Sequence, residues 1–299
     1  MINFFENIFG HQNEIKLLQD LKKGRTPKSM IFSGIKGIGK CLLARKYSEF
    51  YLSSERKGLN GNFLNNIFLL NSSEFENLNM KGVRNIIKEM SLSSINDLQK
   101  FFIIDEFDSL NINCKNALLK NLEEPSDNIN IILISHKYES LLQTVKSRCL
   151  NINFDKLDSN EFQRYLDDNE PGIDSFRKMQ LVNLCQGRPG LYKMVNKLNW
   201  LEIKDNISEV IKKKEIDYEK IDGLFLLYQK DTEIFDFLIK KQLYDLSIIE
   251  LLKNKDNINV SKKIINFLNF ASKSIDANIN INQKNYFISI FINYFRFVK

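Results

Sequence analysis

The sequence has few cysteines, no long apolar run and only a small excess of positive charge. Its four cysteines, Cys41, Cys114, Cys149 and Cys185, form no Cys-x-x-Cys pair, which argues against a zinc site and predicts free thiols. No apolar run is long enough to span a bilayer, and residues 1–7 lack a basic stretch followed by an apolar core. These absences predict a cytoplasmic protein that does not associate with a membrane.

The bulk composition is that of an ordinary globular protein. The chain has 299 residues, of which 43% are hydrophobic and 27% charged, and this length is enough for two or three domains. The formal net charge of +6 permits contact with nucleic acid but does not require it. A well-mixed solvated surface explains the same charge.

Residues 34–41, with the sequence GIKGIGKC, are the most informative stretch of the chain. A phosphate-binding loop needs glycine, four residues, glycine-lysine and then a hydroxyl residue. The glycines allow backbone N–H groups to surround phosphate oxygens, and the lysine reaches the terminal phosphates. The residues predicted to bind a nucleotide here are Gly34, Gly37, Gly39, Lys40 and Cys41.

Cys41 occupies the position where the motif has serine or threonine. The hydroxyl ligates Mg²⁺, which prefers oxygen, whereas a thiol is a soft and poor replacement. The motif therefore predicts the fold of a nucleotide-hydrolysing protein with defective hydrolysis. The simpler alternative is a glycine turn between a strand and a helix, with Lys40 merely solvated.

Short apolar runs alternate with helical patterns in the first half of the chain. The predicted strands are residues 29–33, 67–70, 101–104, 129–134 and 150–154. This alternation predicts an α/β fold with a doubly wound parallel sheet, and strands covered on both faces are expected to be apolar throughout. Beyond residue 154 the pattern is helical only.

An aromatic stripe marks the end of the chain. Its members, at helical spacing, are Phe287, Phe291, Tyr294, Phe295 and Val298. The stripe predicts packed core or a subunit interface, and an aromatic platform for nucleic acid is a weaker interpretation.

Acidic and polar residues follow two of the predicted strands. Asp105 and Glu106 close the strand at 101–104, where a P-loop protein places one carboxylate to hold Mg²⁺ and another to polarise the attacking water. A helix-capping pair is the alternative. Ser135 ends the strand at 129–134, where a polar side chain can sense the γ-phosphate, although a serine at a strand end is common.

Arg148 lies in Ser147-Arg148-Cys149, just before the last strand. A guanidinium at the edge of a domain can stabilise charge on a phosphoryl group that belongs to a neighbouring subunit. The residue pattern alone fits a surface salt bridge equally well.

Together these motifs resemble the AAA+ clamp-loader subunits of bacterial DNA polymerase III. The segments that carry the resemblance are Phe9-Gly10-His11-Gln12, residues 34–40, Ile104-Asp105-Glu106, residues 116–125 (NALLKNLEEP) and Ser147-Arg148-Cys149. The resemblance covers about residues 5–195. It implies an AAA+ P-loop domain at 1–155, a helical lid at 156–200 and an all-α collar for oligomerisation at 201–299.

Within that family the chain is more similar to the delta-prime type than to the gamma and tau motor subunits. Motor subunits carry serine or threonine at the position of Cys41, and they usually have four zinc-binding cysteines after the P-loop helix, where residues 50–67 contain none. The motor subunits' second phosphate-sensing arginine has no clear counterpart, since Arg188 lies in Gly187-Arg188-Pro189-Gly190. No zinc and no required cofactor are expected, and binding of ATP or ADP stays open.

The resemblance implies a non-hydrolysing subunit of a five-membered ring that places the sliding clamp on primed DNA. Its partners would be the gamma or tau motor subunits and the delta subunit, and Arg148 would be the arginine finger acting in trans. Two alternatives stay open: an active motor subunit, and a stand-alone P-loop kinase or nucleotide-binding enzyme.

Overall fold

The computed structural model describes residues 4–6, 8–24, 26–55, 63–71, 80–92, 99–197, 200–212, 222–226, 232–253, 257–273 and 288–294. The chain separates into two units, Met1–Tyr192 and Lys193–Lys299. Each unit is described by itself. The predicted division into three domains stays a prediction.

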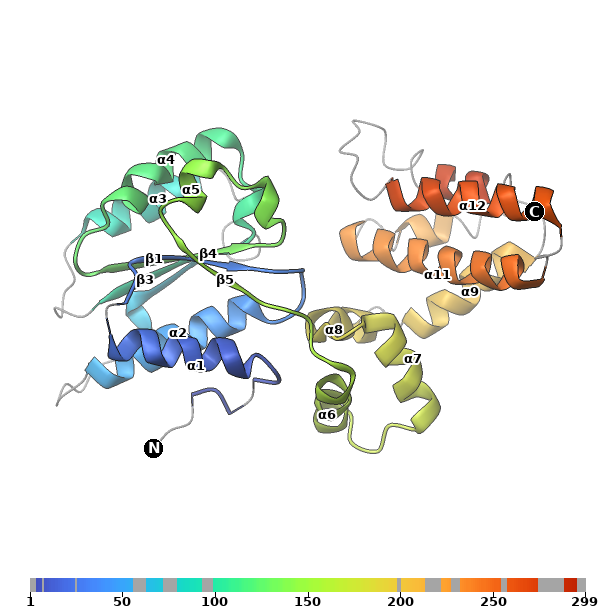
Figure 1. Ribbon diagram of the computed structural model, residues 1–299, viewed down its shortest axis with the longest axis horizontal. Helices are drawn as coiled ribbons and strands as arrows, with labels where there is room; N and C mark the ends of the chain where they lie inside the picture. The colour runs from blue at the N-terminus through green and yellow to red at the C-terminus, as the bar shows by residue number, and fades with distance from the viewer. Residues whose placement is uncertain are drawn as a thin grey trace. The chain divides into compact units, whose positions relative to one another are not determined.

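A five-stranded parallel sheet forms the centre of the first unit (Figure 1). Its strands are β1 (Ser29–Ser33), β2 (Ile67–Leu70), β3 (Lys100–Ile104), β4 (Ile129–Ser135) and β5 (Leu150–Asn153), in the spatial order β2-β3-β4-β1-β5. Each predicted strand is therefore present, with ends shifted by at most one residue. This confirms the predicted α/β fold with a parallel sheet.

Helices cover both faces of the sheet (Figure 1). On one face lie α1 (Gln12–Lys23) and α2 (Lys40–Glu55), and on the other lie α3 (Met80–Ser91), α4 (Ile112–Glu123) and the short α5 (Gln143–Lys146). Three short 3-10 helices join these elements: η1 (Phe63–Asn66), η2 (Phe107–Ser109) and η3 (Tyr138–Ser140).

Alternation along the central strands explains why most of their positions are apolar. On β3, Phe101 and Ile103 pack in the core beneath α1 and α2, while Phe102 and Ile104 pack in the core beneath α3 and α4. Successive side chains of a strand point to opposite faces, so a strand with two covered faces has no solvent side.

Helix α4 begins four residues before the NALLKNLEEP segment at residues 116–125. Asn111 is its N-cap, and the Asn111 Oδ1 accepts a hydrogen bond from the N–H of Cys114 at 2.9 Å. Such a cap satisfies one of the donors that every helix leaves unpaired in its first turn. The helix ends at Glu123, two residues before Pro125, as expected.

Three helices follow the sheet: α6 (Ser159–Asn169), α7 (Ser175–Cys185) and α8 (Pro189–Lys197). The turn between α7 and α8 is tied back to the segment that leaves the sheet, because the N–H of Leu157 donates to the carbonyl of Gly187 at 3.0 Å. Gly187 has φ +75°, and a Cβ there would lie 2.1 Å from the Leu157 carbonyl oxygen. Only glycine fits this turn, which brings the start of α8 back toward the sheet.

Apart from Asn257, the described part of the second unit is helical. It contains α9 (Trp200–Lys212), α11 (Thr232–Lys253) and α12 (Ile258–Lys273), with further helical stretches at 222–226 and 288–294. Of the aromatic stripe, Phe291 and Tyr294 are buried, and the Tyr294 ring lies edge-on to Phe267 of α12. These two side chains are core of this unit, and Phe287, Phe295 and Val298 lie outside the described residues.

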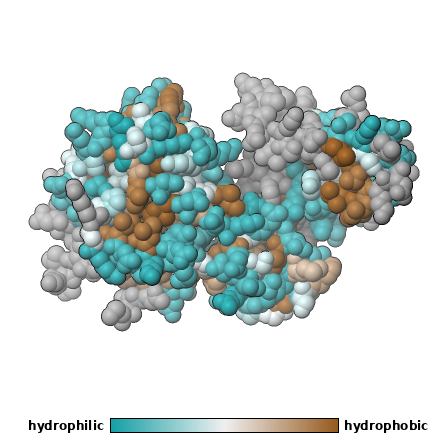
Figure 2. Space-filling model, viewed as in Figure 1, coloured by the Kyte–Doolittle hydropathy of each residue, from teal (hydrophilic) through white to brown (hydrophobic). Residues whose placement is uncertain are grey.

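The surface in Figure 2 is mainly hydrophilic, with hydrophobic side chains in separate patches. Within the described ranges, no helix combines the length and the apolar character needed to cross a bilayer.

Candidate functional site

The candidate site lies at the carboxyl edge of the sheet, where several predicted residues meet. β1 and β4 pair in parallel register, so Ser33, just before the glycine loop, lies opposite Ser135. β3 lies beside β4 and ends at Ile104, directly before Asp105. Parallel strands place their carboxyl ends at one edge, which is where open α/β sheets bind ligands.

The glycine loop runs between β1 and α2 with a backbone that needs glycine. Gly34 has φ +138°, and a Cβ there would lie 2.2 Å from the carbonyl oxygen of Phe154. Gly37 has φ +88° and Gly39 φ +100°, so all three predicted glycines adopt conformations that L side chains rarely take. Helix α2 begins at Lys40, so the loop leads into a helix N-terminus, as an anion-binding loop requires.

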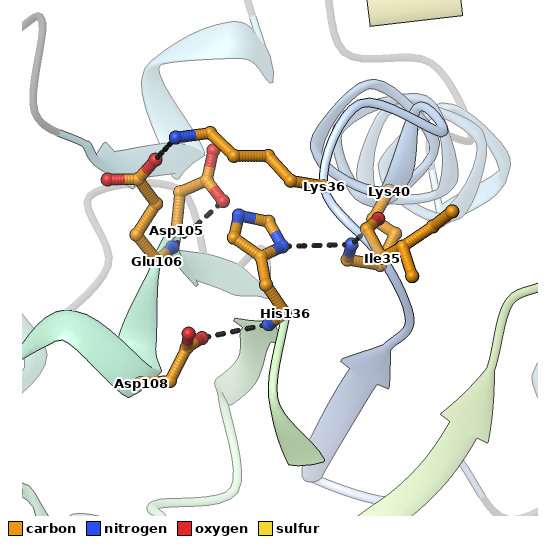
Figure 3. Close-up of polar contacts among 7 residues, drawn as sticks. All are labelled: Ile35, Lys36, Lys40, Asp105, Glu106, Asp108 and His136. Atoms are coloured by element: carbon orange, nitrogen blue, oxygen red, sulfur yellow. Dashed lines mark hydrogen bonds and ion pairs between the residues drawn. The ribbon is translucent and has the colours of Figure 1, made fainter. Parts of the chain in front are cut away.

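The lysine of the glycine loop, Lys40, is bonded to other groups of the same chain. Lys40 Nζ donates to the carbonyl oxygens of Gly34 and Ile35, at 2.7 Å each, and lies 3.0 Å from Nδ1 of His136 (Figure 3). An ammonium group has three N–H donors, and these three partners account for all of them. Only 3% of Lys40 is exposed, so a phosphate cannot reach Nζ while these contacts persist.

Burial and nearby charges shift the titration of both members of this pair. Burial lowers the pKa of Lys40 to about 8, although the carboxylates of Asp105 and Asp108 oppose the shift. Burial, followed by the nearby Lys40 charge, lowers the pKa of His136. A neutral imidazole is what the contact requires, since a nitrogen that accepts from an ammonium carries no proton. The His136 main-chain N–H donates to Asp108 Oδ1 at 2.8 Å, which holds the residue at the end of β4.

The two carboxylates predicted for the nucleotide site, Asp105 and Glu106, are also engaged within the chain (Figure 3). Glu106 forms an ion pair with Lys36 of the glycine loop, with Nζ and Oε1 2.9 Å apart. Asp105 accepts a hydrogen bond from the Glu106 N–H at 2.9 Å. Glu106 is the N-cap residue of η2 but makes no side-chain cap bond, so the helix-capping alternative is not confirmed. Glu106 has φ +50°, uncommon for a residue with a side chain. The ion pair ties the glycine loop to the end of β3.

Ser135 and Cys41 complete the predicted set. Ser135 is fully buried, and its Oγ has no hydrogen-bond partner among the described residues. The Cys41 side chain is half-buried and packs against the hydrophobic core beneath α1 and α2. A thiol packed in this way is poorly placed to serve as a metal ligand. In the described ranges, no group of three histidine, cysteine or acidic side chains could hold a metal ion.

Helix α8 contacts the glycine loop directly. The Gly190 N–H donates to the carbonyl of Gly37 at 2.7 Å, so the loop carbonyl caps a first-turn donor of α8. A Cβ on Gly190 would lie 2.8 Å from Gly37 Cα, so the two backbones touch with no room for a side chain. Arg188, one residue before α8, donates through Nε to the Cys185 carbonyl at 3.2 Å. Its side chain is thus bonded to the end of α7.

The structure places Arg148 far from its own glycine loop. Arg148 precedes β5, and Leu150 of β5 pairs with Met30 near the start of β1, whereas the glycine loop follows the end of β1. Four or five residues of strand separate the two levels, roughly 15 Å at about 3.3 Å per residue. Arg148 therefore lies at the opposite edge of the sheet from the other predicted site residues. It forms an ion pair with Glu123, so the surface salt bridge weighed from the sequence does exist.

Sequence reasoning missed several residues of this site. Lys36 contacts Glu106, His136 contacts Lys40, and Asp108 contacts His136. Only His136 carries a local signal, because it lies two residues after the predicted strand at 129–134. Gly190 and Glu123 touch predicted residues from distant segments, and nothing in their spacing indicates these contacts.

The fold and site together define a P-loop protein of the α/β class, and comparisons with known proteins narrow this class. A family model described as "DNA polymerase III, delta subunit" matches residues 10–158. The DNA polymerase III subunit tau/gamma of Haemophilus influenzae is 26% identical over 184 residues, covering 54% of this chain and 25% of that protein. The replication factor C small subunit of Methanococcus vannielii is 24% identical over 285 residues, covering 86% of this chain and 84% of that protein.

A shorter match concerns the delta-prime type. The DNA polymerase III subunit delta' of Pseudomonas aeruginosa is 46% identical over 52 residues, covering 17% of this chain and 16% of that protein. The chain spans only about a quarter of the tau/gamma relative's length. Together the matches show that the chain is similar to subunits of DNA polymerase III and of replication factor C, which agrees with the clamp-loader resemblance of its motifs.

Proposed function

We propose that this chain is a non-hydrolysing clamp-loader subunit of the delta-prime type. In this function it joins gamma or tau motor subunits and a delta subunit in a ring that places the sliding clamp on primed DNA during replication. Arg148 completes the ATP site of the adjacent motor subunit. The glycine loop of this chain serves as a structural element.

One observation carries the proposal: Lys40, Glu106 and the Gly37 carbonyl of the glycine-loop site are each bonded to another group of the chain. Lys40 is bonded to two loop carbonyls and His136, Glu106 is paired with Lys36, and the Gly37 carbonyl caps α8. Turnover requires a lysine on the phosphates and a carboxylate on the attacking water. Both groups would have to leave buried or paired positions, and Cys41 would still offer Mg²⁺ no hydroxyl.

The position of Arg148 supports a role in trans. It lies at the amino edge of β5, away from the chain's own glycine loop. A guanidinium there can act only on a phosphate that another molecule brings to that edge. Its charge would then stabilise the transferring phosphoryl group of the neighbour.

The competing function is an active motor subunit, which the longer alignment with tau/gamma favours. ATP hydrolysis by the purified chain separates the two, with a motor subunit as positive control and Lys40→Ala as the matched variant. We expect no turnover above the Lys40→Ala background. Cys41→Ser should improve binding of Mg²⁺-nucleotide more than turnover, because Glu106 stays paired with Lys36. Motor-like turnover that disappears in Lys40→Ala would refute the proposal.

The role in trans is tested in a complex reconstituted with motor and delta subunits. Arg148→Ala should leave assembly intact, lower the DNA- and clamp-stimulated ATPase in part, and impair clamp loading. A finger contributes about 10³–10⁵ in rate in related chemistry, but only one of several sites in the ring loses it. Failure of the wild-type chain to co-elute with these partners in gel filtration would favour a stand-alone P-loop enzyme.

A further inference from the structure

Arg148 is held at three points, by one group on α4, one on α5 and the hydroxyl of Ser147, which follows α5. Its Nη2 forms an ion pair with Oε1 of Glu123, the last residue of α4. Its Nη1 donates to the Thr144 carbonyl of α5 at 2.7 Å and to Ser147 Oγ at 3.3 Å. A guanidinium has five N–H donors, so three engaged donors leave two available to a further acceptor.

The end of α4 and the helix α5, which carry the groups that hold Arg148, pack into the same hydrophobic core. Leu122, beside Glu123, and Val145, beside Thr144, are buried in the hydrophobic cluster beneath α3 and α4. The carboxylate and the carbonyl that hold Arg148 are thus attached to elements that cannot shift independently. The pair itself is solvent-accessible, with side-chain exposures of 32% for Arg148 and 45% for Glu123.

An exposed ion pair of this kind contributes little to stability. We therefore expect its main effect to be on the orientation of the Arg148 guanidinium. Arginine has many rotamers, and a finger must place its guanidinium in one of them to meet developing charge. The Thr144 carbonyl and the Ser147 hydroxyl restrain the Nη1 end of the guanidinium. Glu123 restrains the other end and so selects the direction in which the remaining donors point.

We propose that Glu123 is a positioning residue for Arg148, which holds the guanidinium in the orientation that meets a nucleotide phosphate of the neighbouring subunit. This inference rests on the proposed function of Arg148. The same contact allows an opposite role, in which the Glu123 carboxylate competes with the phosphate for the Arg148 guanidinium and so lowers activity. The two roles differ in the sign of the effect when Glu123 is removed.

The test is a double-mutant cycle in the reconstituted complex, with stimulated ATPase followed over a range of ATP concentrations. Glu123→Ala should lower the Arg148-dependent part of kcat by about three- to tenfold, equivalent to about 0.6–1.4 kcal/mol, with KM little changed. In the Arg148→Ala background the same substitution should have no further effect, because Glu123 acts only through Arg148. Glu123→Asp should recover part of the loss.

Glu124→Ala is the matched control. Glu124 is the next residue and also exposed, so its substitution removes the same charge from the same helix end without removing the ion pair. It should leave the ATPase unchanged, and both alanine variants should melt at the wild-type temperature as isolated chains.

Four results would overturn the positioning role. These are a rise in ATPase on Glu123→Ala, no change while Arg148→Ala is impaired, an equal loss in the Arg148→Ala background, and an equal loss with Glu124→Ala. If Arg148→Ala itself has no effect, the finger proposal fails and Glu123 has nothing to position. The single Arg148→Ala variant thus distinguishes failure of the proposed function from failure of this inference.

Discussion

Gly190→Ala tests whether α8 and the glycine loop are in direct backbone contact. The new methyl group would lie 2.8 Å from Gly37 Cα and 3.0 Å from the Gly37 carbonyl oxygen. Both are backbone atoms of a loop that is already fixed by its own glycines, so neither can turn away as a flexible side chain would. Helix α8 must therefore move, and the 2.7 Å hydrogen bond from Gly190 to Gly37 must lengthen or break.

The magnitude follows from three terms. Overpacking against a rigid neighbour costs about 1–3 kcal/mol. Loss of the hydrogen bond costs about 1 kcal/mol. Replacing glycine by alanine in a helix stabilises the helix by about 1 kcal/mol. The net expectation is destabilisation by about 1–3 kcal/mol, with a fall in Tm of about 2–4 °C for each kcal/mol in a unit of this size.

Gly223→Ala is the matched substitution. Gly223 lies in the helical stretch at 222–226, and a Cβ there would meet nothing within 4 Å. The same chemical change should therefore be neutral or stabilising by up to about 1 kcal/mol. Calorimetry of the full-length variants measures both effects. A Gly190→Ala protein as stable as wild type, or less affected than Gly223→Ala, would refute the close backbone contact.

Two further predictions concern stability. The pKa of Lys40 is lowered to about 8, so between about pH 8 and 10.5 the unfolded chain binds more protons at this residue and stability rises with pH. The unfolding free energy of wild type relative to Lys40→Met should increase by about 3 kcal/mol across that window in urea titrations, and a flat difference would contradict the burial of the ammonium. Asn111→Ala should destabilise the first unit by about 1 kcal/mol by removing the cap of α4, while Asn111→Asp should retain most of the stability; equal losses in denaturant midpoint would argue against the cap.

Local patterns determined most of the fold. β1, β3 and β4 were predictable because each is buried along its whole length, so its residues are mostly apolar. β5, at the edge of the sheet, is exposed at three of its four positions and carries a weaker pattern. The glycine loop was predictable because its φ angles need glycine at fixed spacing. The end of α4 follows from Pro125, which disfavours helix in the residue before it, whereas its start depends on the Asn111 cap, which lies before the segment at 116–125.

The sequence by itself therefore determined the strands, the glycine loop and the polar residues that follow the strands. Only the tertiary structure decided the strand order, the contact of Gly37 with Gly190, and the pairing of Lys36 with Glu106, Lys40 with His136 and Glu123 with Arg148. The physical reason is the separation along the chain of the residues that interact. Backbone conformation and strand burial leave a periodic local signal, whereas a contact between distant segments depends on how the whole chain packs. In the folded chain, the lysine of the phosphate-binding motif, Lys40, donates hydrogen bonds to the carbonyls of Gly34 and Ile35 in the same loop.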